Sequence, residues 1–190
     1  QAAGRTIRIQ AGENGSIQGP GEACFGYTVL TVADWDGDGL LDMVANSILG
    51  KVVWYKNIGT ARQPRLAAAQ AVEVQWDGPP PALAWGWMRP QGKQLLTQWR
   101  TTPLACDWNQ DGLTDLIMLD QEGYLALFPR AKRGDPLKLL PPQRVFCGAD
   151  GKPLQLNAKQ AGASGRRKFC VVDFDGDGKL DFLVNRSNAT

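Results

Sequence analysis

The chain has 190 residues, of which 43% are hydrophobic and 21% are charged, and its formal net charge at pH 7 is +2. These values are ordinary for a globular domain, and no apolar stretch approaches the roughly 20 residues of a membrane-spanning helix. The sequence contains no histidine, which excludes Ser-His-Asp and Cys-His catalysis and histidine metal sites within it. It also lacks a P-loop, a dinucleotide fingerprint and a G-x-S-x-G elbow.

Short β-branched or aromatic runs bounded by turn residues predict strands along the whole chain. In chain order the runs are Thr6–Ile9, Thr28–Ala33, Met43–Ala45, Lys51–Tyr55, Ala71–Val74, Pro103–Cys106, Leu116–Leu119, Tyr124–Phe128, Arg144–Phe146, Phe169–Val172 and Phe182–Val184. Glycine turns at Gly50 and Gly123 precede two of them. No segment has an amphipathic period of 3.6 over ten or more residues, so we expect an all-β fold.

One acidic pattern, D-x-[DN]-x-D-G-x-x-D, occurs three times, each time between two predicted strands. The copies are Asp34–Asp42, Asp107–Asp115 and Asp173–Asp181. Calcium prefers six to eight oxygen ligands at roughly 2.3–2.6 Å, and carboxylates at alternate positions of a tight loop converge on one ion. The glycine at the sixth position allows the sharp turn. The pattern therefore predicts up to three Ca²⁺ sites.

The spacing of the loops separates several kinds of calcium-binding protein. EF-hands and dockerins share the loop pattern, but in them a helix follows the loop, and no helical period is present here. Thrombospondin-type repeats are much shorter than the 73 and 66 residues that separate the starts of these loops. A repeat of this length with three or four strands is the size of a β-propeller blade with insertions.

Residues 28–57, 103–130 and 169–185 resemble the FG-GAP / VCBS-repeat family of calcium-binding β-propellers, which includes the integrin α-subunit head. The resemblance implies that each loop joins the first two strands of a blade and binds calcium. The implied side-chain ligands are Asp34, Asp36, Asp38, Asp42, Asp107, Asn109, Asp111, Asp115, Asp173, Asp175, Asp177 and Asp181. The implied backbone carbonyl ligands are Leu40, Leu113 and Lys179. Two departures are the Asn at position 109 and the lack of a clear Phe-Gly…Gly-Ala-Pro signature.

We therefore expect residues 1–190 to form a partial propeller of about three blades. The blade repeats fall around 24–76, 99–146 and 166–190, with a Trp/Pro-rich insertion at 76–100. Propellers close with about four to eight blades, so the rest of the ring would come from a longer parent chain or another subunit. The alternative is a three-blade array capped by the predicted N-terminal strand.

The insertion holds the candidate ligand-binding residues. Exposed indoles of Trp76, Trp85 and Trp87 could stack on sugar rings, with Arg89 and Arg100 meeting carboxylates. The alternative is that the insertion folds back and buries its indoles.

The leading functional hypothesis is a secreted, periplasmic or cell-surface module that binds carbohydrate or protein and uses structural calcium. Three calcium ions would add six positive charges to the net charge of +2, which favours acidic polysaccharide as a partner. Alternatives are a segment of a polysaccharide-degrading lyase or glycosidase, and an integrin-like protein-interaction scaffold. We assign no catalytic residue, and we expect neither nucleic acid as a partner nor a membrane span.

Overall fold

The computed structural model describes residues 28–46, 49–83, 89–98, 100–132, 135, 138–157 and 168–184. Within these ranges every regular element is a β-strand, which confirms the all-β prediction. In the same ranges, no helix has the length and apolar character needed to cross a membrane. The predicted strand Thr6–Ile9 and the candidate ligands Trp85 and Trp87 lie outside the described residues.

The first sheet is an antiparallel meander of four strands in the order β1-β2-β3-β4. Its strands are β1 (Val29–Ala33), β2 (Asp42–Asn46), β3 (Val52–Tyr55) and β4 (Gln70–Ala71). The first acidic loop joins β1 to β2, and Ala33 pairs with Asp42 across its base. The loop therefore closes the hairpin as the resemblance implies.

The second and third sheets begin with the same hairpin. The second contains β6 (Leu104–Cys106), β7 (Asp115–Leu119) and β8 (Leu125–Phe128), and the third contains β10 (Phe169–Val172) and β11 (Asp181–Val184). All pairs in both sheets are antiparallel. A separate parallel pair joins β5 (Glu73–Val74) to β9 (Lys138–Leu139) and so links the first two repeats.

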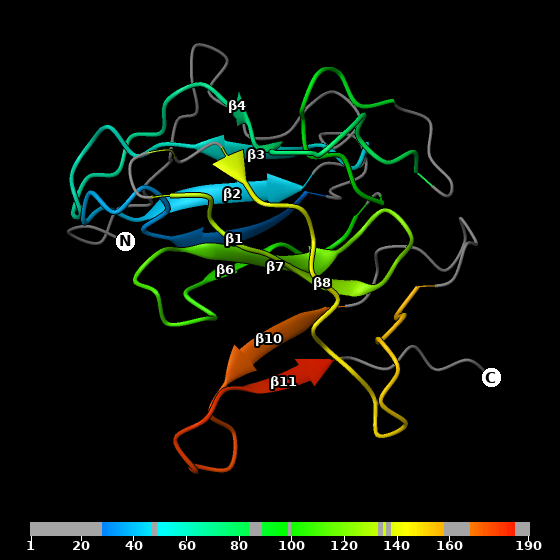
Figure 1. The fold of residues 1–190 in the computed structure, drawn as a ribbon. Helices are drawn as coiled ribbons and strands as arrows, with labels where there is room; N and C mark the ends of the chain where they lie inside the picture. Colours follow the sequence, from blue (N-terminus) through cyan, green and yellow to red (C-terminus); the bar gives the residue numbers. More distant parts are fainter. Residues whose placement is uncertain are drawn as a thin grey trace.

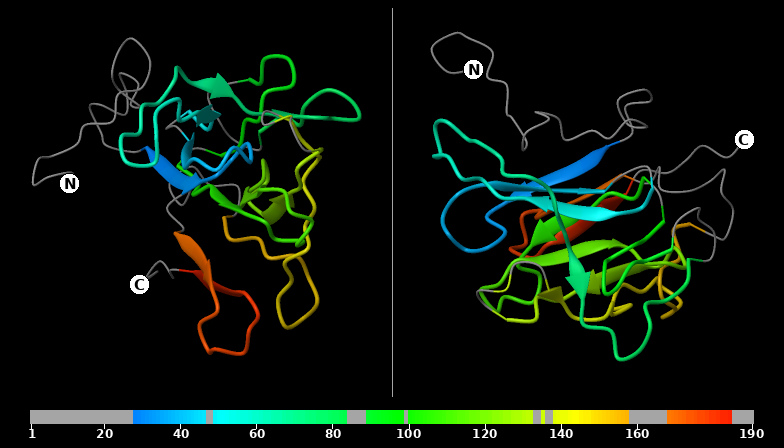
Figure 2. Two further views of the ribbon diagram at one scale, coloured as in Figure 1. Left: turned by 90° about the vertical axis from the view of Figure 1, so that its left-hand side faces the viewer. Right: turned by 90° about the horizontal axis from the view of Figure 1, so that it is seen from above.

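The three sheets are stacked, with the second between the other two (Figure 1). The views of Figure 2 agree and place the β10–β11 hairpin at one end of the stack. One hydrophobic core runs between the sheets, with Trp54 and Val44 from the first, Ile117 and Phe128 from the second, and Phe169 from the third. The three acidic loops lie on the same side of the stack (Figure 1).

The described sheets do not form a closed ring, so the propeller interpretation stays a prediction. The predicted run Ala71–Val74 divides into β4 and β5 at Val72, which bonds to the main chain of Val52. The predicted run Arg144–Phe146 is not a strand, and only single bridges form beside it, at Gln143 and Cys147. Strand β9 was not predicted, because Lys138–Leu139 has only two residues.

The described end of the Trp/Pro-rich insertion folds back onto the first sheet. The amide of Leu95 donates to the carbonyl of Val72 at 2.7 Å, and the amide of Val52 donates to the carbonyl of Leu95 at 3.2 Å. Leu95 is buried in the core. In the second repeat the amide of Leu125 donates to the carbonyl of Leu154 at 2.9 Å in the same way.

The two predicted glycine turns hold the returning segments. Gly50 and Gly123 have φ angles of +79° and +83°, which side chains with a Cβ rarely adopt. A Cβ at either position would overlap a backbone carbonyl oxygen, that of Thr97 or that of Asn157. The turns therefore need glycine for conformation and for close approach.

Candidate metal centre

The first acidic loop is folded around the carboxylate of Asp34. This carboxylate accepts hydrogen bonds from the amides of Gly37, Asp38 and Gly39 at 2.9, 3.1 and 2.9 Å. Gly37 and Gly39 have φ angles of +78° and +86°, so glycine at these two positions lets the chain turn tightly without strain. The amide of Leu40 donates to Asp38 Oδ1 at 2.9 Å.

The other two loops repeat this fold. Asp107 accepts from the amides of Asp111 and Gly112 at 3.1 and 2.9 Å. Asp173 accepts from the amides of Gly176 and Gly178 at 2.8 and 3.0 Å. The amides of Leu113 and Lys179 each donate at 2.8 Å to the aspartate two residues earlier, as Leu40 does. Three segments far apart in sequence thus share one local conformation.

Carboxylates gather in the first and third loops. One oxygen from each of Asp34, Asp36 and Asp38 lies within 4.8 Å of the others, and Asp173, Asp175 and Asp177 form the same arrangement. Either set could hold a metal ion. The second loop brings Asn109 into the middle position, where its side-chain amide donates to Asp111 Oδ2 at 2.9 Å.

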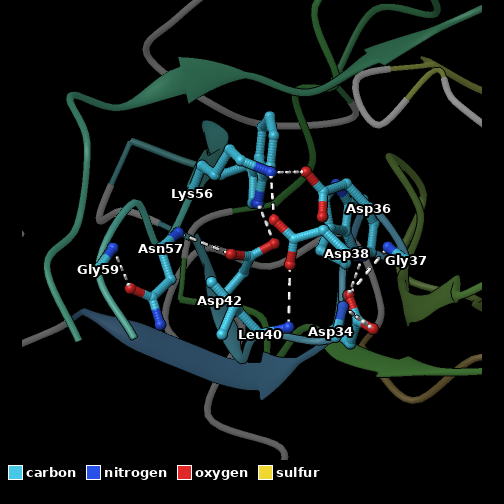
Figure 3. A network of polar contacts seen from close by, with 12 residues as sticks. Asp34, Asp36, Gly37, Asp38, Leu40, Asp42, Lys56, Asn57 and Gly59 are labelled. Atoms are coloured by element: carbon cyan, nitrogen blue, oxygen red, sulfur yellow. Dashed lines mark hydrogen bonds and ion pairs between the residues drawn. The ribbon is translucent and has the colours of Figure 1, made fainter. Parts of the chain in front are cut away.

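Lys56 enters the first loop from the end of β3 (Figure 3). Its ammonium forms ion pairs with Asp36 Oδ2 and, at 2.6 Å, with Asp38 Oδ2. Burial opposes the charge of Lys56, but these hydrogen bonds raise the pKa of its amine. The hydrogen bond from Lys56 lowers the pKa of Asp38. A side-chain cation therefore already neutralises part of this loop.

Sequence reasoning missed Lys56 because its role depends on strand register. Tyr55, the last residue of β3, pairs with Met43, so Lys56 directly after the strand lies beside Asp42, at the base of the loop. The third loop has a weaker counterpart, because the exposed Lys179 pairs at 2.8 Å with Asp177 and with no other acid among the described residues.

The aspartate at the ninth position of each loop accepts a main-chain hydrogen bond. Asp42 accepts from the amide of Asn57 at 2.7 Å and from Trp54 Nε1 at 3.0 Å. Asp115 accepts from the amide of Arg130 at 2.8 Å. In the third loop Asp181 accepts from the amide of Phe174 at 2.9 Å.

Asp42 and Asp115 are buried, and burial raises the pKa of both carboxyl groups. The neighbouring charge of Asp111 raises the pKa of Asp115 further. The main-chain amides of Trp108 and Asn109 favour the charged form of Asp115 and lower its pKa in part. In the first loop the buried Asp36 Oδ1 has no hydrogen-bond partner among the described residues. A hard cation bound in the first loop would satisfy this oxygen and balance the negative charge.

Arg130 and Thr114 of the second repeat hold the first loop in place, and neither was predicted. Thr114 Oγ1 donates to the carbonyl of Asp34 at 2.9 Å. The guanidinium of Arg130 donates to the carbonyls of Trp35 and Thr114 at 3.1 and 2.9 Å. Burial lowers the pKa of Arg130 to about 10, so the side chain stays charged at neutral pH.

The candidate ligand-binding residues do not form one described group. Trp76 is half-buried and packs against the core. Arg89 is exposed, whereas Arg100 is half-buried with a φ angle of +60°. Carbohydrate stacking by the insertion therefore stays a prediction.

Comparisons with known proteins add no family assignment. No protein-family model matches the chain, and neither a curated protein nor a solved structure matches it.

Proposed function

We propose that the chain is an exported calcium-binding β-repeat module of the FG-GAP / VCBS type, in which metal ions stabilise the first hairpin of each repeat. The observation that carries the proposal is the unpaired, buried carboxylate oxygen of Asp36 in the first loop. The shared loop conformation and the two aspartate triads support it. Aspartate and backbone oxygens in a glycine turn match the ligand preference of Ca²⁺ rather than that of softer metals.

The three loops should differ in calcium affinity. In the third loop the three aspartates are exposed, and among the described residues the cation paired with them is Lys179, which contacts Asp177. In the first loop an ion must displace Lys56 from two carboxylates. The second loop has one charge fewer because of Asn109. We therefore infer that the third loop binds most tightly.

The partner of this module is proposed to be carbohydrate, with an extracellular protein as the alternative. The exposed Arg89 supports recognition of acidic sugars. A glycan array of acidic and neutral sugars, read for binding and for released products in the same wells, separates a binding module from a polysaccharide-degrading enzyme. Binding without product supports the module, and product formation overturns that assignment.

Thermal unfolding with and without calcium tests the metal role. A site that binds only the folded state adds about 2.7 kcal/mol at roughly 100 times its dissociation constant. We expect calcium to raise the unfolding temperature, magnesium to raise it less, and a chelator to lower it. Asp175→Asn should reduce the shift, whereas Asp77→Asn, an exposed acid outside the loops, should not. Equal unfolding temperatures in calcium and chelator would contradict the proposal.

A further inference from the structure

One face of the β10–β11 hairpin is exposed and mostly apolar. Cys170 pairs with Leu183 and Val172 pairs with Asp181, and alternate residues of a strand share a face. These three apolar residues therefore lie on one side, with the half-buried Asp181 at the loop end of that side. On the opposite side Phe169 and Phe182 pack on each other and toward the second repeat, with ring centroids 5.0 Å apart. Cys170, Val172 and Leu183 are exposed, and an open hollow lies beside Cys170 and Leu183.

The equivalent face is covered in both preceding sheets. Val44 and Ile117 stand at the position of Leu183 after their loops and are 1% and 0% exposed, whereas Leu183 is 38% exposed. The aromatic residue of the loop follows the same order, because Trp35 is 2% exposed, Trp108 is half-buried and Phe174 is 72% exposed. Arg130 of the second repeat covers the ring of Trp35, and the second sheet lies next to the first in the stack (Figure 1).

The other end of the stack exposes the opposite face of the repeat. Leu30 and Val32 pair with Ala45 and Met43, on the face of the first sheet that points away from the second. Leu66 packs on Ala45 over part of this face, but Leu30 and Val32 are 39% and 48% exposed.

The same face is buried where the chain itself supplies a neighbour. Leu116 stands at the position of Met43 in the second repeat and is fully buried against the first sheet. Phe182 stands there in the third repeat and lies 5.6 Å from Phe146, centroid to centroid. At each junction inside the chain, the face that carries Val44 or Ile117 in one sheet therefore packs toward the face that carries Leu116 or Phe182 in the next sheet.

We propose that a second copy of this chain docks its first sheet on the exposed face of the β10–β11 hairpin. Leu30 and Val32 of one copy would cover Val172, Phe174 and Leu183 of the other. The occupant follows from continuity with the existing interfaces, because this contact repeats a junction that the chain already makes twice. The contact is heterologous, and such contacts give closed rings or open filaments according to their rotation. Leu30, Val32, Val172 and Leu183 belong to strands, and Phe174 is the one residue of this contact that lies in an acidic loop.

Sedimentation velocity of the full chain, over a wide range of concentrations in calcium buffer, tests this proposal. The unchanged chain should form dimers or larger assemblies. Phe174→Ser places a polar side chain on the β10–β11 face, and Val32→Ser places one on the face of the first sheet. Each variant should be monomeric. An equimolar mixture of the two variants should form a dimer and nothing larger, because each variant supplies one intact face.

The controls distinguish the proposed contact from nonspecific association and from misfolding. Ile58 is an exposed apolar residue outside both faces, so Ile58→Ser should assemble as the unchanged chain does. Leu183→Ser provides a second variant of the β11 face if Phe174→Ser lacks the near-ultraviolet circular dichroism of a folded protein. A monomeric unchanged chain at every concentration would overturn the proposal. So would a mixture of the two folded variants that stays monomeric.

Discussion

The guanidinium of Arg130 lies over the ring of Trp35, with its central carbon 3.9 Å from the ring centroid. Arg130 follows β8 of the second sheet, and Trp35 is the second residue of the first acidic loop. The same guanidinium donates to the carbonyl of Trp35. A buried cation of one repeat therefore fixes the acidic loop of the preceding repeat, which ties this candidate metal loop to the packing of the sheets.

The contact between Arg130 and Trp35 should contribute measurably to the stability of the fold. Arg130→Lys should lower the free energy of unfolding by about 2 kcal/mol, because lysine cannot stack on the ring and reach two carbonyls with a planar fork. Urea denaturation followed by tryptophan fluorescence measures the loss. Arg89→Lys, at an exposed position, is the matched control and should change stability little. Equal stability of Arg130→Lys and the unchanged chain would show that the contact is dispensable.

Replacing Asp115 by Asn should have opposite effects with and without calcium. Asn keeps the oxygen that accepts from the amide of Arg130 but removes a buried charge. Without metal, the unfolding free energy should stay the same or rise, and with calcium the stabilisation from the second loop should disappear. Calorimetric unfolding in chelator and in calcium measures both effects. The same loss of stability in both buffers would argue for a purely structural aspartate.

The unfolding free energy of the metal-free chain should depend on pH because of the buried carboxyl group of Asp115. Burial raises the pKa of Asp115 above its value in the unfolded chain. The folded state therefore binds this proton more tightly, so the charged carboxylate costs stability above the raised pKa. That cost should fall as the pH is lowered through the raised pKa. Asp115→Asn should remove this component from a series of unfolding measurements between neutral and acidic pH.

Lys56 should act as a competing cation in the first loop. Lys56→Met should strengthen calcium binding there by about tenfold, which equals about 1.4 kcal/mol, because the ion no longer displaces an ammonium from Asp36 and Asp38. The measurement is a calcium titration in a background in which Asp111→Asn and Asp175→Asn weaken the other two loops. Lys179→Met in the same background should have no effect on the first loop. Weaker binding after Lys56→Met would mean that the lysine organises the loop for the metal.

Gly123→Ala should destabilise the second repeat by about 3 kcal/mol, because it combines a strained φ angle with a close approach to the carbonyl of Asn157. Chemical denaturation measures the loss. Gly151→Ala is a matched control, since its φ angle of +73° is similar but a Cβ there meets no atom within 4 Å. A similar loss for both variants would assign the effect to backbone strain alone.

Local patterns in the sequence were sufficient to predict most strands, the three loop conformations and the turns at Gly50 and Gly123. These features depend on residues within a few positions of one another, such as the glycines and aspartates of a loop. Lys56 and Arg130 were missed because their partners are 20 and 95 residues away in sequence. Their roles depend on strand register and on the order in which the sheets stack, which composition does not encode.

The Trp/Pro-rich insertion is a second case in which contacts distant in sequence could not be predicted from local patterns. Its tryptophans suggested a sugar-binding surface, but exposed and buried indoles have the same sequence signature. Trp76 packs against the core just after β5, which pairs with β9 of the second repeat, and Leu95 returns to the first sheet through hydrogen bonds to Val72 and Val52. No local pattern marks that return.

Isothermal titration of the chelator-treated chain with calcium measures whether the acidic loops bind this metal. We expect heat from the tightest site first, assigned to the third loop by its loss in Asp175→Asn, and weaker binding at the first and second loops. No binding heat from the unchanged chain at several temperatures, together with an unfolding temperature that is the same with and without calcium, would show that the loops are not calcium sites.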